Sequence, residues 1–430
     1  MKGHPMSSAR STGVSDRADL PLPRSVIHKA SSVTRLDRWF AAQVQRSIAD
    51  GPVGLELWDG QPAPGAPSRP VGDLVVGDRR ALLGLAFNPD LYLGEAYSAG
   101  RIRVRGTLKE VVTALSRSSA ANPSWWERAA DLLARANDVA AARRNVQHHY
   151  DLGNDFYAMW LDADMVYTCA YYPEDGMTLD AAQRAKLDLV CRKLQLRGGE
   201  TVVEAGCGWG ALALHMARKY AVRVKAFNLS GEQMRWARER ARHEGLESRV
   251  EFIEDDYRQV TGTYDAFVSV GMLEHVGHRS FDALSRVIQR TIKRDGGRGL
   301  LHFIGRDVPR PLNAWIRRRI FPGGYTPTLA EVTSEILGPA GMSVLDVENL
   351  RLHYARTLAQ WSERFEAAAD RVRAIQGEEF YRAWELYLAG SEAAFRTGWM
   401  QLFQIVFSPN GSTPPFLTRA ALYQASRMAP

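Results

Sequence analysis

The spacing of hydrophobic positions changes near Leu187, where short apolar runs begin to alternate with amphipathic stretches. The runs predict strands at Thr201–Glu204, Val222–Asn228, Val250–Glu254, Tyr264–Val270 and Gly299–Ile304. The stretches predict helices at Ala211–Lys219, Glu232–His243, Ser280–Lys293 and Ala330–Leu337. This alternation is typical of an α/β fold with a mainly parallel, doubly wound sheet. Two helices between Thr357 and Arg396 and a late strand at Met400–Phe407 complete the prediction.

A different pattern precedes this region. A helix at Arg38–Ile48 is followed by short strand-like runs at Val53–Trp58, Leu74–Val76 and Arg101–Val104, separated by Gly and Pro. We therefore predict three parts. These are a disordered lead-in at residues 1–32, a small N-terminal accessory α+β domain at 33–120, and a main domain at 121–430 that opens with a helix at Trp125–Asn145.

Composition narrows the class of protein. Of the 430 residues, 45% are hydrophobic and 24% charged, which excludes a mostly disordered chain, a collagen and a coiled coil. No apolar run approaches the roughly 18 residues of a membrane span, and Met1–Arg35 lacks the apolar core of a secretory signal. The three cysteines form no CxxC pair, so we expect neither disulfides nor a metal site. A cytoplasmic location follows.

A glycine-rich turn marks the first candidate site. The first strand of the α/β region ends in Glu204, and Gly206, Gly208 and Gly210 follow directly before a helix. Glycines allow a tight turn close to a ligand, and the helix N-terminus offers free N–H groups. Alone, such a turn is weak evidence, because a packing turn can have the same sequence.

The next strand argues against a dinucleotide. An acid at its end would hold a ribose diol, but Asn228 and Ser230 stand there, followed by Gln233. Glu204 better suits S-adenosylmethionine (SAM), whose ammonium group a carboxylate can pair. Asp255, Asp256 and Tyr257 then fall where an adenine would lie, although a capping turn explains these three equally well.

Seven strings together resemble the cyclopropane fatty acid synthase family, which includes the mycolic acid cyclopropane synthases. They begin at His148–Tyr157, Tyr167–Tyr172 and Glu204–Gly210, and continue at Gly271–Gly277, Leu301–Gly305, Phe321–Gly324 and His353–Leu358. The likeness spans about residues 145–408. Leu93–Tyr97 is more loosely similar to the accessory domain of longer bacterial members that act on phospholipids.

The resemblance implies a class I SAM methyltransferase fold and methyl transfer from SAM to a cis double bond of an acyl chain, followed by ring closure. It implies that a bound bicarbonate accepts the proton, held by side chains matching Glu274, His302 and Tyr354 and by backbone matching Cys169 and Ile304. The expected cofactor-binding residues are Tyr167, Thr168, Glu204, Gly206, Gly208, Gly210, Asn228, Ser230, Gln233, Asp256 and Tyr257.

The chemistry requires a dry site, because water would trap the carbocation that attack by an alkene leaves. Aromatic faces stabilise such a cation. The candidates are Tyr150, Phe156, Tyr167, Tyr171, Trp209 and Phe303. Taken singly, Glu274 would suit a helix cap and His302 a core histidine. Only their joint occurrence favours catalysis.

Three alternatives stay open. A sister enzyme would stop at a methyl- or methylene-branched chain, a non-catalytic relative would only bind lipid, and a small-molecule N-methyltransferase would share the catalytic half. Ser391 stands where many relatives have a cysteine, which leaves the product less certain.

Charge suggests the partner. The net charge of +7 favours an anionic surface, and Arg306–Tyr325 interleaves Arg310, Arg317, Arg318 and Arg319 with apolar side chains. We expect peripheral contact with an anionic membrane that presents unsaturated phospholipid acyl chains; a solvated helix face is the alternative. No nucleic-acid module is present, so no nucleic acid is expected. A homodimer is a further expectation.

Overall fold

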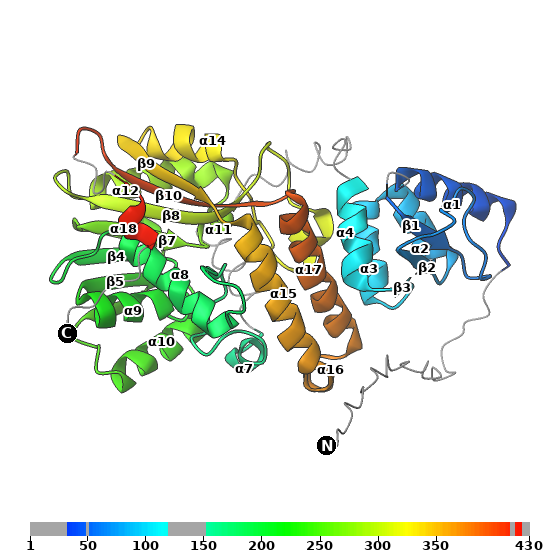
Figure 1. The fold of residues 1–430 in the computed structure, drawn as a ribbon, viewed down its shortest axis with the longest axis horizontal. Coiled ribbons are helices and arrows are strands. Elements are labelled where there is room, and N and C mark those ends of the chain that lie inside the picture. Colours follow the sequence, from blue (N-terminus) through cyan, green and yellow to red (C-terminus); the bar gives the residue numbers. More distant parts are fainter. Residues whose placement is uncertain (1–31, 49–50, 119–151, 413–417, 424–430) are drawn as a thin grey trace, which may run out of the picture. The chain divides into compact units, whose positions relative to one another are not determined.

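The computed structural model describes residues 32–48, 51–118, 152–412 and 418–423 (Figure 1). The described residues from Val33 onward belong to one compact unit. Three sequence-based predictions lie outside the described residues: the lead-in up to residue 31, the helix at Trp125–Asn145, and the first part of the His148–Tyr157 string, including Tyr150.

A seven-stranded sheet forms the centre of the α/β region, in the order β6-β5-β4-β7-β8-β10-β9. The strands are β4 (Thr201–Ala205), β5 (Arg223–Asn228), β6 (Val250–Glu254), β7 (Ala266–Val270), β8 (Arg298–Gly305), β9 (Met342–Asn349) and β10 (Gln401–Pro409). Strands β4 to β8 pair in parallel, whereas β10 pairs antiparallel with both β8 and β9. The doubly wound α/β prediction is confirmed, and β9 is an additional edge strand.

Helices cover both faces of this sheet (Figure 1). Helices α8 (Leu179–Lys193), α9 (Ala211–Tyr220) and α10 (Gly231–His243) pack one hydrophobic cluster. Helix α12 (Phe281–Thr291) and the turns at α14 (Leu329–Glu331) and Val332–Leu337 pack the other. The packed layers on both faces fix the positions of the strands. The loops that follow the carboxyl ends of β4, β5, β6 and β7 are where α/β proteins of this kind bind their ligands.

The prediction of two helices between Thr357 and Arg396 was wrong, because the structure has three helices there. Helices α15 (Arg351–Ala367), α16 (Ala369–Gln376) and α17 (Glu378–Thr397) fill the region. Gly377 adopts φ of +85° between α16 and α17, and Ala368 ends α15. The break at Ala368 lies in an alanine-rich run of good helix formers, which hides it from a propensity argument. Helix α15 also starts before Thr357, which places Tyr354 on its first turn.

Residues 33–118 form a separate small sheet with its own hydrophobic cluster. The strands β1 (Val53–Glu56), β2 (Gly72–Val76) and β3 (Ile102–Arg105) lie in that order, β1–β2 parallel and β2–β3 antiparallel. The helices are α1 (Arg35–Ser47), α2 (Arg79–Phe87), α3 (Pro89–Ser98) and α4 (Leu108–Ser118). The accessory domain with a boundary at residue 120 stays a prediction.

The Leu93–Tyr97 string connects this small sheet to the rest of the unit. A Cβ on Gly94 would lie 2.3 Å from the Trp315 ring, so only glycine permits that contact. The Tyr97 hydroxyl donates to Glu385 of α17 at 2.7 Å. The Leu93–Tyr97 string therefore contacts Trp315 and α17 directly, and position 94 requires glycine because a Cβ there would overlap the Trp315 ring.

The basic segment Arg306–Tyr325 is partly used by the same contact. Trp315 is buried within an aromatic cluster, and Arg319 on α13 (Ala314–Arg319) pairs with Glu95 of α3 at 2.6 Å. Arg310 stacks over Trp399. Arg318 remains exposed. Membrane contact by this segment stays a prediction, carried by fewer side chains than the sequence suggests.

Candidate active site

A cavity of about 1050 Å³, including its opening to solvent, lies at the carboxyl ends of the parallel strands. Of the expected cofactor-binding residues, its lining contains Tyr167, Thr168, Glu204, Gly206, Gly208, Asn228, Gln233, Asp256 and Tyr257. The two others lie behind the lining. Gly210, at φ of +82°, packs on Phe252 and Ala237, and Ser230 caps α10 by accepting a hydrogen bond from the Gln233 N–H. Their part in cofactor binding stays a prediction.

Glu204 is the carboxylate best placed for a cation. It is buried near the end of β4, and the backbone N–H of Ala213 in α9 favours its charged form. Its Oε2 atom is buried with no hydrogen-bond partner among the described residues. Burial raises the pKa of Glu204 to about 8, while the nearby Lys186 ammonium lowers it. An unpartnered carboxylate oxygen in a cavity wall fits the ammonium group of SAM.

The next two strand ends supply polar groups of different kinds. The Asn228 amide donates to Gln233 Oε1 at 2.7 Å and to the Gly208 carbonyl, so it closes the glycine turn. Asp256 caps the short turn Tyr257–Gln259 through the Arg258 N–H and also pairs with the Arg258 guanidinium at 2.7 Å. The capping interpretation of Asp256 therefore holds, in a residue that also lines the cavity.

Glu274 extends the pairing of the sheet beyond the end of β7. The Gly271 N–H donates to the His302 carbonyl, and the next free N–H of β8, that of Ile304, donates to Glu274 Oε1 at 2.6 Å. Glu274 Oε2 is buried without a hydrogen-bond partner in the part of the chain that the structure describes. Burial raises the pKa of this carboxyl to about 7.

His302 lies two residues before Ile304 on β8, so both side chains face the same side of the sheet. Across the strand, the Gln404 amide nitrogen lies 3.0 Å from His302 Nδ1. Because that amide donates, Nδ1 accepts and the ring proton lies on Nε2. Burial, Lys186 and Lys193 hold the pKa of His302 well below its usual range, which keeps the ring neutral. His302 Nε2 is buried without a partner among the described residues.

Cys169 and Tyr354 meet at the start of α15. The Cys169 thiol contacts the Leu350 carbonyl at 3.9 Å, and the Tyr354 N–H donates to that same carbonyl. The Leu350 N–H donates to Leu402, the β10 neighbour of Ile304. Contacts through Leu350 and Leu402 thus connect Cys169 and Tyr354 to Ile304, which bonds Glu274 and shares β8 with His302. None of the five expected catalytic residues lines the cofactor cavity.

Aromatic rings surround this region. Tyr354 packs on Phe395 with 4.5 Å between ring centroids and lies edge-on to Trp361. The Tyr167 hydroxyl lies 2.8 Å from that of Tyr387. Phe156, Trp209 and Tyr171 belong to the same buried cluster, whereas Phe303 packs in the other sheet layer. Ser391 is half-buried on α17.

Sequence reasoning missed two polar residues of α8 because it placed no helix at Leu179–Lys193. Gln183 donates to the carbonyls of Val166 and Thr168, at 3.2 and 2.8 Å, and Lys186 donates to Thr168 Oγ1 at 2.8 Å. The signal was present, since apolar Leu179, Ala182 and Leu189 recur at helical spacing.

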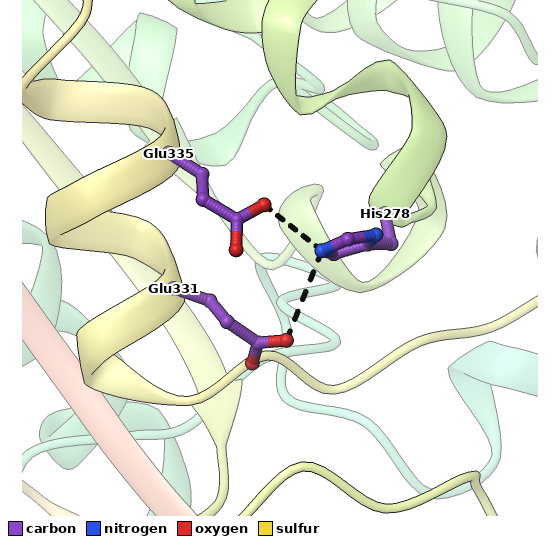
Figure 2. A group of neighbouring side chains, drawn as sticks. All are labelled: His278, Glu331 and Glu335. Carbon is purple, nitrogen blue, oxygen red and sulfur yellow. Dashed lines mark ion pairs between the residues drawn. The ribbon is translucent and has the colours of Figure 1, made fainter.

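A second cluster lies outside the cavity (Figure 2). His278 Nε2 lies 2.9 Å from Glu335 and 3.8 Å from Glu331, and the three residues could offer ligand atoms to a cation. However, Glu331 already accepts hydrogen bonds from Tyr325 and from Thr328, whose turn it caps. The cluster is a helix-capping network with an ion pair.

No helix among the described residues has both the length and the apolar character required to cross a bilayer.

Comparison with known proteins identifies the family. The family model of mycolic acid cyclopropane synthetase matches residues 137–405. A probable fatty acid methyltransferase of Pseudomonas putida is 39% identical over 369 residues, covering 83% of this chain and 91% of the relative. Cyclopropane-fatty-acyl-phospholipid synthase of Escherichia coli (strain K12) is 40% identical over 263 residues, covering 61% and 67%.

Solved structures agree. The mycolic acid cyclopropane synthase CmaA1, complexed with SAH and CTAB, is similar with a TM-score of 0.58 at 34% identity, covering 62% of this chain and 97% of that one. The fold is that of class I SAM methyltransferases, and SAM is the methyl donor. This chain is a SAM-dependent methyltransferase that belongs to the mycolic acid cyclopropane synthetase family.

Proposed function

We propose that this enzyme adds a methylene group from SAM across the cis double bond of an unsaturated phospholipid acyl chain and so forms a cyclopropane ring. When bound, SAM supplies an electrophilic methyl group on a sulfonium. Glu204 would hold the ammonium of SAM through its unpartnered Oε2, and the loop with Gly206 and Gly208 would accommodate the amino-acid part. Positive φ at both glycines supports this close approach.

The observation that carries the proposal is the pair of buried, unpartnered polar atoms Glu274 Oε2 and His302 Nε2. A buried polar atom without a partner is costly and usually marks a ligand position. Neutral His302 offers a donor at Nε2 and Glu274 an acceptor. This combination fits an anion that carries one O–H, as bicarbonate does.

A bicarbonate held there would supply a weak base, which suffices for a proton on a carbon beside a carbocation. Glu274 and His302 would orient it, with Tyr354 and the backbone of Cys169 and Ile304 completing the pocket. The neutral state of His302 matters, because a charged imidazolium would repel the cation. Burial therefore keeps His302 neutral, so that its Nε2–H could donate to the anion without adding a positive charge.

The aromatic cluster supports the same chemistry. Tyr167, Tyr354 and Trp361 present ring faces or edges inside a region that also buries Trp160 and Phe365. A water-poor site protects a carbocation from hydration, and ring faces stabilise it.

A second candidate is methyl branching without ring closure. The similar probable fatty acid methyltransferase and a tuberculostearic acid methyltransferase at 38% identity favour it. Ser391, where many relatives have cysteine, leaves the product open between the two. The buried Glu274 and His302 pair favours a product that loses a proton from the added methyl group, which is a cyclopropane ring or a methylene branch. A saturated methyl branch would instead take up a hydride from a reductant.

The test is incubation of the purified protein with SAM and vesicles of mono-unsaturated phosphatidylglycerol, with and without added bicarbonate. Released fatty acids are analysed by mass spectrometry and proton NMR. We expect a gain of one CH₂ with high-field ring protons, and faster turnover with bicarbonate. The same mass gain with vinylidene signals, or with the signals of a methyl-branched alkene, would establish the second candidate. No gain on phospholipid, free fatty acid or carrier-bound chains would refute both.

A further inference from the structure

Helix α8 carries two lysines on its buried face. Lys186 is 2% exposed and Lys193 is 0% exposed, and their separation of seven positions places both on one side of the helix. A buried ammonium group is costly unless it is paired or serves another purpose. Each lysine therefore requires an explanation.

Lys193 has a structural one. Its Nζ lies 2.5 Å from Glu348 Oε2 and 3.9 Å from Asp346, both on β9. This ion pair joins α8 to the edge of the sheet, and Lys193 does not line the cavity.

Lys186 has no such partner. Within the described residues it forms no ion pair, and its one hydrogen bond runs from Nζ to Thr168 Oγ1 at 2.8 Å. It lines the cofactor cavity together with Glu204 and Thr168. The stretch Val166–Cys169 has no helix or strand of its own, and Gln183 of α8 donates to its Val166 and Thr168 carbonyls in place of backbone pairing.

We propose that Lys186 is a positioning residue of this site. Its ammonium group fixes Thr168 at the cavity wall, and its charge favours the ionised form of the Glu204 carboxyl, which the cationic cofactor requires. The inference rests on the proposed binding of the SAM ammonium by Glu204. It concerns cofactor binding alone and is therefore tested separately from the lipid product.

The surrounding charges agree with this role. Cys169, Asp162 and Glu204 interact electrostatically with Lys186 and raise its pKa against burial, and Lys186 in turn lowers the pKa of His302 on β8. Glu204 is faced by Lys186 and Cys191 from α8, by Cys207 in the glycine turn and by the Ala213 N–H of α9. Lys186 is the cation that lowers the pKa of Glu204, against the burial that raises it.

The experiment is calorimetric titration of the full-length protein with SAM from pH 6 to pH 9. Without Lys186, Glu204 would keep its proton to a higher pH, so binding would be lost earlier on acidification. The pH at which half of the SAM binding is lost is the midpoint of this titration. For Lys186→Met we expect the midpoint to rise by about one pH unit, which corresponds to about tenfold weaker binding at pH values below it. Lys186→Arg, which restores the charge, should lie between this variant and the wild type.

Lys193→Met is the matched control, because it removes an equally buried ammonium from the same helix face. It should lower thermal stability and leave the pH midpoint of SAM binding unchanged. Thr168→Val removes the hydrogen-bond acceptor and keeps the shape. It should shift the midpoint in the same direction as Lys186→Met, and it decides the matter if that variant does not fold.

Two results would overturn the inference. The first is an unchanged pH midpoint of SAM binding in Lys186→Met, or in Thr168→Val if Lys186→Met does not fold. The second is a shift in Lys193→Met as large as that in Lys186→Met. In Glu204→Gln the pH dependence assigned to this carboxyl should disappear. If it persists there, another group causes it and the inference fails. Normal SAM binding with no lipid product would instead refute the proposed function and leave this inference standing.

Discussion

Glu274 is the residue at which binding and chemistry separate most clearly. Its carboxylate accepts the Ile304 N–H and does not line the cofactor cavity. For Glu274→Gln we expect turnover to fall by about 10² to 10⁴, the usual contribution of a positioned acid–base group. The Kd for SAM, measured by calorimetry, should stay within a factor of about three. Equal loss of both would show that Glu274 has a structural role.

The same substitution predicts a pH-dependent gain in stability. Burial raises the folded-state pKa of Glu274 to about 7, so its favourable contribution is present at low pH and is lost as pH rises through 7. Ionising this buried group costs on the order of 3 kcal/mol at pH 8. Glu274→Gln should therefore become more stable relative to wild type between pH 5 and pH 8.

Urea unfolding at the two pH values, in buffer free of bicarbonate, measures this difference. A stability difference independent of pH would contradict the assigned burial of the carboxylate. Together with the loss of turnover, the expected result would show a group kept at a cost in stability for its function.

At the scale of elements, the contact between α3 and α13 depends on one glycine. Gly94→Ala would place a methyl carbon 2.3 Å from the Trp315 ring, and because that contact cannot be relieved by a small shift, we expect destabilisation of about 1–3 kcal/mol. Gly390→Ala on α17 is the control. A Cβ at this position would lie 3.9 Å from Val112 Cγ1, its nearest neighbour outside the helix backbone, which is an ordinary van der Waals contact.

The control should stabilise the protein by about 0.4–1 kcal/mol, because alanine is the better helix former and the space is free. Thermal unfolding of both variants beside the wild type measures the pair. A neutral Gly94→Ala would mean that α3 and α13 are not packed as the structure shows.

Helices and strands with a clear periodicity of hydrophobic positions could be predicted from the sequence. Elements whose side-chain pattern depends on contacts with other parts of the fold could not. Strand β6 was predicted within its observed bounds, because its apolar residues stand out from polar surroundings. Helix α8 escaped notice because two lysines interrupt its apolar stripe, and their burial depends on partners outside the helix, Thr168 and Glu348.

The site shows the same division. Glycine turn and strand ends are local features, so Glu204, Asn228 and Gln233 could be placed at a ligand cavity from the sequence. That Glu274 would pair with the backbone of Ile304 depends on where β7 ends beside β8. The resemblance to a family supplied Glu274, His302 and Tyr354; no periodicity would have done so.

For the whole molecule, the remaining question is how a net charge of +7 is used. We propose that it brings the enzyme to an anionic membrane surface. Binding to phosphatidylglycerol vesicles should then weaken strongly from about 0.1 M to about 1 M salt, where the Debye length falls from about 10 Å to about 3 Å. Co-sedimentation measures it, with neutral phosphatidylcholine vesicles as the reference.

A local variant distinguishes a membrane-facing surface from overall charge. Arg318 on α13 is exposed and lies 3.8 Å from Glu95, which already pairs with Arg319. Arg318→Gln should weaken vesicle binding by about 1 kcal/mol, the usual contribution of one basic residue near an anionic surface. Arg286→Gln on α12 removes the same unit of charge from an exposed arginine paired with Asp282. If both variants weaken binding equally, total charge attracts the membrane; a larger effect at Arg318 places α13 against the lipid, where acyl chains would enter.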